Sequence, residues 1–216
     1  SIAENAAEAT VGTLSSSDPD SGDSVTYSVS GTDAASFEVS GTTLKLKSGV
    51  SADYETKASY AVTITATDTG GLTASQAFTL TVTDVNEAAS ITLSNTTVAE
   101  NSSGASVGTV TVSDPDVGDS YTLALSGTDA DSFEVSGTTL KLKSGVSADY
   151  ETKASYAVTI TATDTGGLST SQAFTVTVTN VNEAPSGVSL SASSITENVA
   201  GATVGTLSAS DPDAGD

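Results

Sequence analysis

The sequence repeats itself with a period of 96 to 97 residues, and this repetition restricts the folds that the chain can adopt. The string SDPD-x-GD occurs three times, with its first aspartates at Asp18, Asp114 and Asp211. Residues 36–72 and 132–168 are identical at all 37 positions. A period of this length indicates tandem copies of one structural unit, each of which packs against its neighbours.

The repeats divide the chain into three parts. We expect one repeat over residues 1–88, a second over residues 89–184 and the N-terminal part of a third over residues 185–216. The first repeat lacks its opening strand, the counterpart of residues 90–97, so we expect the sequence to be a window of a longer array. The third part is too short to bury a core of its own. We therefore predict that it is ordered only where another repeat or a neighbouring chain covers it.

Within a repeat, apolar and polar residues alternate, which is the period of a β-strand. Tyr60, Val62 and Ile64 fall on one face of such a segment, and threonines fall on the other. Gly70-Gly71 separates two alternating runs and predicts a hairpin turn. About seven short strands in each repeat predict an all-β fold of tandem, immunoglobulin-like antiparallel β-sandwiches of about 96 residues.

The composition excludes several classes of function. The chain has 27 acidic residues, 6 basic residues, no His and no Cys, for a net charge of −21. It therefore forms no disulfide, no thiolate or imidazole metal site and no Ser–His or Cys–His catalytic pair. Its charge argues against nucleic-acid binding, and no apolar run is long enough to insert into a membrane. Paired carboxylates would also suit a glycosidase, but an enzyme site repeated at every turn is not expected, and we predict that the chain is not an enzyme.

The acidic residues lie at predicted strand ends and turns, not along the polar strand faces. Loops of a sandwich gather at its two ends, so these carboxylates would repel one another unless a cation offset their charge. Ligands that are all oxygen favour Ca²⁺ over Zn²⁺, and their number suits the larger Ca²⁺ shell better than that of Mg²⁺. In the first repeat the acids concerned are Glu4, Asp18, Asp20, Asp53, Glu55, Asp68, Asp84 and Glu87.

Five motifs in a fixed order identify a resemblance. The order is Glu4-Asn5, Asp18-Pro19-Asp20, Asp53-Tyr54-Glu55, Asp68-Thr69-Gly70 and the segment 84–88, DVNEA, and it recurs in the second repeat. This series resembles the tandem cadherin repeat, particularly the cadherin-like repeats of large bacterial surface proteins. The resemblance implies a cadherin-like sandwich and a calcium site, usually with three Ca²⁺ ions, at each junction between repeats.

The resemblance also implies which residues bind the ions. At the first junction it implies Glu4, Asp53, Glu55, Asn86, Glu87, the carbonyls of Val85 and Ala88, Asp114, Asp116, Asp164 and a carbonyl near Asp119. The seven carboxylates in this set would nearly balance the six charges of three Ca²⁺ ions. At the second junction it implies Glu100, Asp149, Glu151, Asn182, Glu183, Asp211 and Asp213.

Other positions complete the set of candidate ligands. Asp18, Asp20 and Asp68 of the first repeat stand at the motif positions of Asp114, Asp116 and Asp164 and are candidates as well. Asn180 replaces Asp84 in the second repeat, and we interpret that position as one that orders the linker more than it binds metal.

Three functions fit these observations. The first is a calcium-rigidified structural extender in a bacterial cell-surface adhesin or extracellular filament, which near-identical repeats favour. The alternatives are direct homotypic adhesion and carbohydrate binding. The expected partners are neighbouring repeats of the same array, neighbouring copies in a filament and a carbohydrate or other cell-surface ligand. All three functions place the protein outside the cell.

Overall fold

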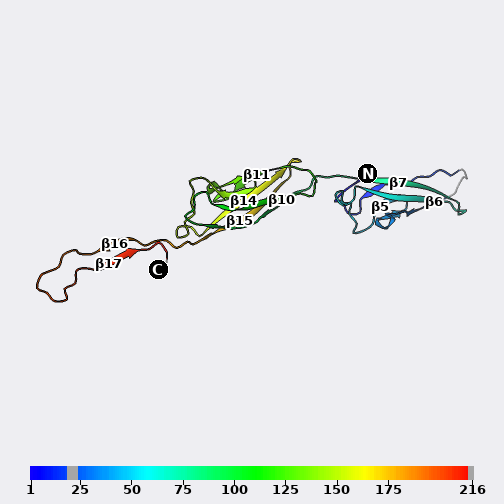
Figure 1. Cartoon of the computed structure of the whole chain (residues 1–216). Helices are drawn as coiled ribbons and strands as arrows, with labels where there is room; N and C mark the ends of the chain where they lie inside the picture. Colours follow the sequence, from blue (N-terminus) through cyan, green and yellow to red (C-terminus); the bar gives the residue numbers. More distant parts are fainter. Residues whose placement is uncertain (19–23, 214–216) are drawn as a thin grey trace. The chain divides into compact units, whose positions relative to one another are not determined.

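The computed structural model describes residues 1–18 and 24–213, and strands dominate it (Figure 1). The predicted hairpin at Gly70-Gly71 is confirmed. It joins β6 (Ser59–Thr67) to β7 (Thr73–Thr83), which pair antiparallel from Thr67↔Thr73 to Ser59↔Thr81. Gly71 has a φ of +86°, which glycine adopts without a steric cost.

The first repeat is built from two sheets. One has the strand order β1-β7-β6-β3, and the other has the order β2-β5-β4. Their side chains meet in a common core, in which the largest fully buried members are Phe37, Ile2, Leu46 and Val62. The remaining strands are β1 (Ile2–Ala3), β2 (Thr10–Thr13), β3 (Thr26–Ser30), β4 (Phe37–Ser40) and β5 (Thr43–Leu46).

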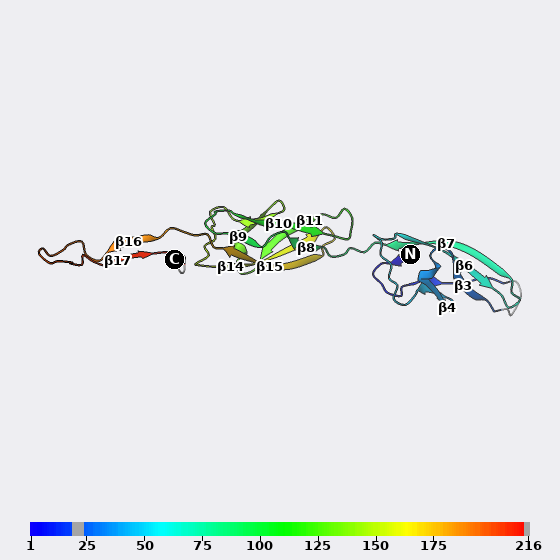
Figure 2. The same ribbon diagram turned by 60° about the horizontal axis from the view of Figure 1, so that its bottom comes forward.

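The second repeat has the same two sheets and one additional strand. The sheets run β11-β14-β15-β9 and β12-β13-β10-β8, and β8 has no counterpart among the described residues of the first repeat. Figure 2 marks β8 and β9 in the second repeat. The strands are β8 (Ser90–Leu93), β9 (Thr97–Ala99), β10 (Ser106–Ser113), β11 (Tyr121–Ser126), β12 (Phe133–Ser136), β13 (Thr139–Leu142), β14 (Ser155–Asp164) and β15 (Ser169–Thr179).

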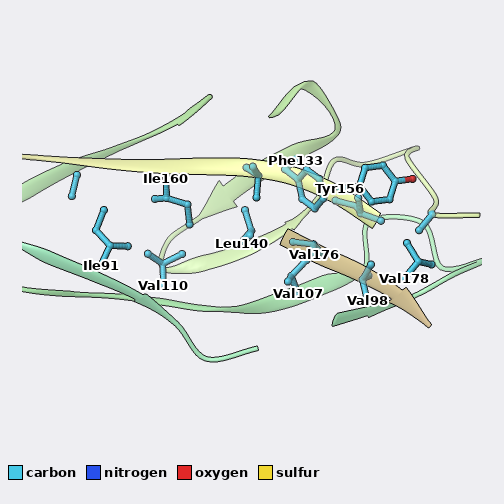
Figure 3. Packing of buried hydrophobic residues seen from close by; sticks show 14 residues of the cluster. Ile91, Val98, Val107, Val110, Phe133, Leu140, Tyr156, Ile160, Val176 and Val178 are labelled. Carbon is cyan, nitrogen blue, oxygen red and sulfur yellow. The ribbon is translucent and has the colours of Figure 1, made fainter. Parts of the chain in front are cut away.

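The core of the second repeat shows why the apolar residues alternate. Leu140, Val110, Ile160 and Val176 point into the space between the sheets, where they are buried together (Figure 3). Phe133 packs edge-on against Tyr156, with ring centroids 5.6 Å apart. Both sheets therefore present one apolar face, as the sequence predicts, and the tandem β-sandwich fold is confirmed.

One pair of strands in each repeat differs from the antiparallel prediction. β1 pairs with β7 in parallel, and β9 pairs with β15 in parallel. In each repeat a short strand early in the sequence pairs with the last strand, and two or three residues form this pair. So short a pairing leaves no alternating pattern in the sequence, which is why it was not foreseen.

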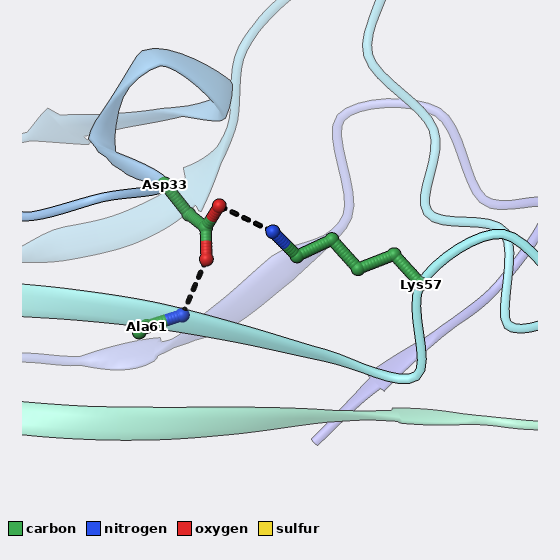
Figure 4. A network of polar contacts seen from close by, with 3 residues as sticks. All are labelled: Asp33, Lys57 and Ala61. Carbon is green, nitrogen blue, oxygen red and sulfur yellow. Dashed lines mark hydrogen bonds and ion pairs between the residues drawn. The ribbon is translucent and has the colours of Figure 1, made fainter.

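A lysine in each repeat anchors the short 3₁₀ helix that precedes a core phenylalanine. The helices are η1 (Ala34–Ser36) and η2 (Ala130–Ser132). Lys57 pairs with Oδ1 of Asp33, and the backbone N–H of Ala61 donates to Oδ2 of Asp33 at 2.7 Å (Figure 4). The ammonium also lies 5.1 Å from the ring centroid of Tyr60. Lys153, Asp129, Ala157 and Tyr156 repeat the arrangement.

The start of the third repeat forms a two-stranded hairpin. β16 (Ser186–Leu190) pairs with β17 (Leu207–Ser210), and the register shifts between Ser186 and Ser189. Gly187, the residue that lengthens the second period to 97, lies in this irregularity with a φ of +64°. An inserted residue with positive φ is typical of a β-bulge.

The contacts divide the chain into two units. One comprises Ser1–Glu87 together with Asp114–Asp119, and the other comprises Ala88–Ser113 and Ser120–Asp216. The acidic turn of the second repeat therefore folds with the end of the first repeat. The boundaries after residues 88 and 184 that the repeat pattern suggests stay a prediction.

Candidate metal centre

Glu4 is the centre of the first acidic cluster. It follows β1 directly and is only 3% exposed. Its Oε1 accepts the backbone N–H of Val85 at 2.6 Å, and its Oε2 accepts that of Tyr54 at 2.7 Å. Two N–H donors from segments far apart in the sequence provide hydrogen bonds to both oxygens of this buried carboxylate. Glu4 thus connects the turn after β1 to the segment at Tyr54 and to the segment at Val85.

Glu55 and Asp84 complete a group of three carboxylates around Glu4. One oxygen of each lies within 4.8 Å of the others. Burial raises the pKa of Glu55, and the charges of Glu4, Asp84 and Glu87 raise it further. Burial also raises the pKa of Asp84, with contributions from Asp116 and Glu4. Like charges held this close need a cation or a proton between them.

The acidic turn at residues 114–119 supplies a second arm of the cluster. The backbone N–H of Glu87 donates to Oδ2 of Asp116 at 2.6 Å, and the N–H of Asp116 donates to Oδ1 of Asp114 at 3.1 Å. Asp119 Oδ2 is buried without a hydrogen-bond partner in the described part of the chain. A buried carboxylate oxygen that is left unpaired indicates a ligand position.

The second cluster repeats this framework around Glu100, which is also 3% exposed. Its carboxylate accepts the N–H groups of Tyr150 and Val181, both at 2.7 Å. Two groups of three carboxylates share Glu151, and each has oxygens within 4.8 Å of one another. They are Glu100, Asp149 and Glu151, and Glu151, Glu183 and Asp213.

Asp213 is the most informative acid of the second cluster. Its Oδ2 accepts the N–H of Glu183 at 2.7 Å, and its N–H donates to Oδ1 of Asp211 at 3.0 Å. The residue is 8% exposed, yet its Oδ1 has no hydrogen-bond partner among the described residues. An orphaned, buried carboxylate oxygen that faces other acids fits a cation ligand.

Asp84 and Asn180 distinguish the two clusters. Asp84 lies inside the first cluster with Glu4 and Glu55, whereas we interpreted its position as one that mainly orders the linker. Asn180 donates from Nδ2 to Oε1 of Glu151 at 3.1 Å. The amide therefore replaces one negative charge of the second cluster with a hydrogen-bond donor.

Asp53 and Asp149 hold the turns that carry Glu55 and Glu151. Asp53 Oδ1 accepts the N–H of Thr56 at 2.8 Å, and its Oδ2 bonds the Thr56 hydroxyl at 3.0 Å. The same bonds from Thr152 lower the pKa of Asp149, the N–H of Thr152 contributing most.

The linker residues predicted as ligands lie beside their clusters. Asn86 donates from Nδ2 to the carbonyl of Glu87 at 3.4 Å, and Asn182 donates to that of Glu183 at 3.0 Å. Val85 contributes its N–H to Glu4, and Ala88 is the first residue of the second unit. Whether the carbonyls of Val85 and Ala88 bind metal stays a prediction.

Three of the other predicted ligands have surroundings or contacts within their own repeat, and their role as metal ligands stays a prediction. Asp18 and Asp68 line a separate small cavity of about 180 Å³ in the first repeat. Asp164 Oδ1 accepts the N–H of Leu168 at 2.9 Å and caps the β14–β15 hairpin in the second unit. Asp20 lies outside the described residues.

Two kinds of functional residue were missed from the sequence. The first is the side chain of Asp119, for which we expected only a nearby carbonyl; its place at the end of the SDPD-x-GD string was the available signal. The second is the asparagine after each buried glutamate. Asn5 donates to Glu87, and Asn101 donates to Glu183. The repeated Glu-Asn pair marks these positions, although it does not reveal their partners.

The donor set fits a hard divalent cation. Each cluster combines carboxylates from several segments of the chain with a buried, unpartnered carboxylate oxygen, and it has no nitrogen or sulfur ligand. Oxygen ligands of this number and charge suit Ca²⁺.

Comparisons with known proteins support the repeat organisation. The family model of the cadherin domain matches residues 1–83 and 94–179. A search of curated proteins found no match. Neither short helix in the described part of the chain has the length or the hydropathy to cross a membrane.

Solved structures share the fold over almost the whole chain. A cis-dimer structure of protocadherin gammaB7 EC3-6 is 28% identical, with a TM-score of 0.63 over 99% of this chain and 54% of its own. Mouse cadherin-23 EC22-24 is 23% identical, with a TM-score of 0.66 over 99% and 74% of the two chains. Protocadherin gamma B2 extracellular domains 3-6 are 22% identical, with a TM-score of 0.67 over 99% and 54%. The chain therefore spans about half the length of the protocadherin chains.

Proposed function

Because this chain belongs to the cadherin family, whose domain model matches both of its long repeats, we propose that its acidic clusters bind Ca²⁺ and that the bound ions stiffen a run of extracellular repeats. Cadherin domains are adhesion modules without enzymatic activity. The role proposed for these repeats is that of an extender, which sets the distance between a surface and whatever the longer protein contacts.

The observation that carries this proposal is the uncompensated charge of the clusters. Glu4, Glu55 and Asp84 hold oxygens within 4.8 Å of one another. Asp213 is buried, and one of its oxygens has no hydrogen-bond partner within residues 1–18 and 24–213. Extracellular calcium modules bind with dissociation constants of about 10⁻⁴–10⁻³ M, which suits open clusters of this kind.

The ligands named here supply the mechanism of stiffening. Glu87 ends the first repeat, and its N–H bonds Asp116, which the second repeat contributes. Ca²⁺ held by Glu4, Glu55, Asp84 and Asp116 would tie these segments to one another. Without Ca²⁺, repulsion among the same carboxylates would separate them and loosen the linker.

The near-identity of the repeats favours the extender over the alternatives. A spacer needs length, whereas a recognition module needs a distinct surface. We place such a segment in a bacterial surface adhesin or filament, outside the cell, with neighbouring repeats of the array as its partners. Homotypic adhesion is the second candidate, because the protocadherin gammaB7 relative is described as a cis-dimer.

Calcium titration of the full chain tests the proposal. Asp116→Asn and Asp213→Asn each remove one charge, from the first and the second cluster, and keep a similar shape. Isothermal titration should show weaker binding or fewer sites for each variant. Asp131→Ala is the matched control, because the first repeat has Ala35 at the same position. Unchanged binding in both cluster variants would contradict the assignment.

Stiffening needs its own measurement. Small-angle scattering in Ca²⁺ should show a single, well-defined maximum dimension for the chain, as expected for a stiff array. Addition of EDTA should make that dimension less well defined and lower the melting temperature. If Ca²⁺ binds but neither quantity changes on chelation, the ions bind without a mechanical role.

A further inference from the structure

β11 forms an open edge of the second repeat. It is the terminal strand of the sheet β11-β14-β15-β9, and within the described part of the chain it pairs with β14 alone. The pairing runs through all of β11, from Tyr121↔Asp164 to Ser126↔Thr159, without a register shift. Half of the backbone groups of such a strand bond the neighbouring strand, and the other half point away from the sheet.

The contacts of Ala157 show which residues of β11 present groups outward. The N–H of Ala157 donates to Oδ2 of Asp129 at 2.8 Å, and its carbonyl accepts the N–H of Asp129 at 3.2 Å. Asp129 follows β11, so both backbone groups of Ala157 point to the β11 side of β14. Because direction alternates along a strand, the groups of Thr159, Thr161 and Thr163 point the same way.

The register then assigns the two sides of β11. The residues opposite these three threonines bond them, and they are Thr122, Ala124 and Ser126. The residues between them therefore present their N–H groups and carbonyls outward. These are Tyr121, Leu123 and Leu125.

This edge lacks the features that usually prevent edge strands from pairing. Natural edge strands are short, carry charged residues or proline, or contain a bulge. Among the other terminal strands of the second repeat, β9 has three residues, β8 has four, and Glu134 of β12 pairs with Lys141 at 3.0 Å. β11 has six residues, and residues 120–128 include no charged residue and no proline.

The neutral edge is suited to a second copy of the same chain. The chain has a net charge of −21. Two copies of so acidic a protein repel each other, and contact costs least where neither copy presents a charge. The strand is also its own complement, because Tyr121 and Leu125 lie two residues on either side of Leu123. Antiparallel pairing of two copies about Leu123 therefore places every outward N–H opposite a carbonyl.

We propose that β11 pairs antiparallel with β11 of a second copy, with Leu123 opposite Leu123. Tyr121 of each copy then lies opposite Leu125 of the other, and each of these residue pairs exchanges two backbone hydrogen bonds. The Tyr121 side chain is 38% exposed, and its contact with Leu125 removes apolar surface from water. The same surface is used on both copies, so the contact is isologous.

β15 offers a second uncharged edge, whose side chains are less suitable. β9 pairs only with Thr177–Thr179, which leaves the earlier residues of β15 without a paired strand on that side. The N–H of Thr177 donates outward to the carbonyl of Thr96 at 2.8 Å, so every second residue before it also faces outward. Strand pairing there would bury no large apolar side chain, because these residues are Ser169, Ser171, Ala173 and Thr175.

The first repeat has a shorter edge of the same kind as β11. β3 is the terminal strand of its sheet, and Ala61 bonds Asp33 through the same two backbone groups (Figure 4). Ser28 stands at the position of Ala124, and both are exposed on the polar face of the edge strand. Because both long repeats offer this edge, the test variants change both.

Sedimentation velocity of the full chain in Ca²⁺, at concentrations rising to several hundred micromolar, tests the proposal. The wild type should self-associate. Ser28→Glu combined with Ala124→Glu should weaken the association at least several-fold, because like charges on facing strands repel. Ser28→Lys combined with Ala124→Lys should weaken it for the same reason. An equal mixture of the two variants should associate more strongly than either alone, through pairs of opposite charge.

A matched control adds the same charge away from the edge. Ala77→Glu combined with Ala173→Glu changes two exposed positions on β7 and β15. This variant should associate as the wild type does, and all variants should keep the wild-type melting temperature. A monomeric wild type would overturn the proposal, as would an acidic edge variant that associates normally. Loss of association in the control alone would also overturn it, because the contact would then lie at β15.

Cysteine substitutions test the register, because the chain has no cysteine of its own. The proposed pairing places Thr122 of one copy opposite Ala124 of the other, with Cα atoms about 4.5 Å apart. A disulfide spans that distance. A mixture of Thr122→Cys and Ala124→Cys should therefore form disulfide-linked dimers on mild oxidation faster than a mixture of Thr122→Cys and Ala173→Cys. Equal rates would contradict the pairing.

The association is independent of the calcium proposal. Neither Ser28 nor Ala124 belongs to an acidic cluster, so calcium titration of the edge variants should match that of the wild type. Loss of calcium binding in Asp116→Asn or Asp213→Asn would leave the edge of β11 unchanged. Failure of one proposal is therefore distinguishable from failure of the other.

Discussion

Asn5 donates a hydrogen bond from Nδ2 to Oε1 of Glu87 at 2.5 Å, across 82 residues of sequence. Asn101 makes the same bond to Glu183 at 2.7 Å. Asn5 and Asn101 have φ values of +59° and +60°, a left-handed conformation that asparagine tolerates better than most residues. The buried glutamate before each asparagine bonds the backbone of the linker, while the asparagine orients the linker's own carboxylate.

The first prediction concerns this asparagine. Asn5→Gly keeps the left-handed backbone and removes the amide, so Glu87 loses its orientation. A hydrogen bond to a charged group contributes about 1.5–3 kcal/mol, and we expect calcium affinity at the first cluster to fall by several fold. Calorimetric titration measures this change. Asn101→Gly should weaken the second cluster instead, and equal affinity in both variants and the wild type would contradict the role.

The second prediction uses the natural difference between the clusters. Asp84→Asn gives the first cluster the residue that the second has at Asn180. Burial and the charge of Asp116 raise the pKa of Asp84, which means that its negative charge is unfavourable in the folded protein without metal. Removal of this charge should therefore increase the melting temperature in EDTA. Calcium affinity of the first cluster should fall. Asn180→Asp should lower the melting temperature in EDTA and raise the calcium affinity of the second cluster. A change of melting temperature with the same sign in both variants would refute this explanation.

The third prediction concerns the anchor of the 3₁₀ helix. The hydrogen bond from Lys57 lowers the pKa of Asp33, and the N–H of Ala61 lowers it further. A lowered pKa in the folded state means that the stabilisation is complete above the unfolded pKa of about 4. It is lost as the pH falls through the folded pKa. Asp33→Asn should reduce the melting temperature at pH 7 and bring it close to the wild type in acid.

Thermal denaturation at several pH values checks this result. Asp131→Ala is the control, since this exposed acid lies on η2 and its counterpart in the first repeat is Ala35. Its effect should be small and similar at every pH. A constant difference between Asp33→Asn and the wild type across the acid range would show that the ion pair does not titrate as described.

The fourth prediction compares two phenylalanines of the first repeat. Phe37 is fully buried and meets Tyr60 edge-on at 5.4 Å, whereas Phe78 is 44% exposed. Phe37→Ala should lower the free energy of unfolding of its repeat by about 3–5 kcal/mol. Phe78→Ala should cost much less, because water already reaches its ring. Equal losses in urea denaturation would mean that the ring of Phe78 is buried in solution.

Much of the architecture could be predicted because it depends on local patterns. Alternation at Tyr60, Val62 and Ile64 placed a strand with one apolar face, and Gly71 placed the turn that follows it. The 97-residue step identified Gly187 as an insertion, and that residue lies at a register shift. These features depend on residues within a few positions of one another, and the chemistry of each residue specifies them.

The sequence by itself determined that this is a tandem all-β protein with acids gathered at its turns, because strand periodicity and turn residues are local properties. Only the tertiary structure decided that Glu4 bonds Tyr54 and Val85, that Asp84 lies inside a cluster and that one oxygen of Asp213 finds no partner in the described part of the chain. These relationships join residues tens of positions apart, and no local pattern encodes which backbone donor reaches which carboxylate once the sheets pack.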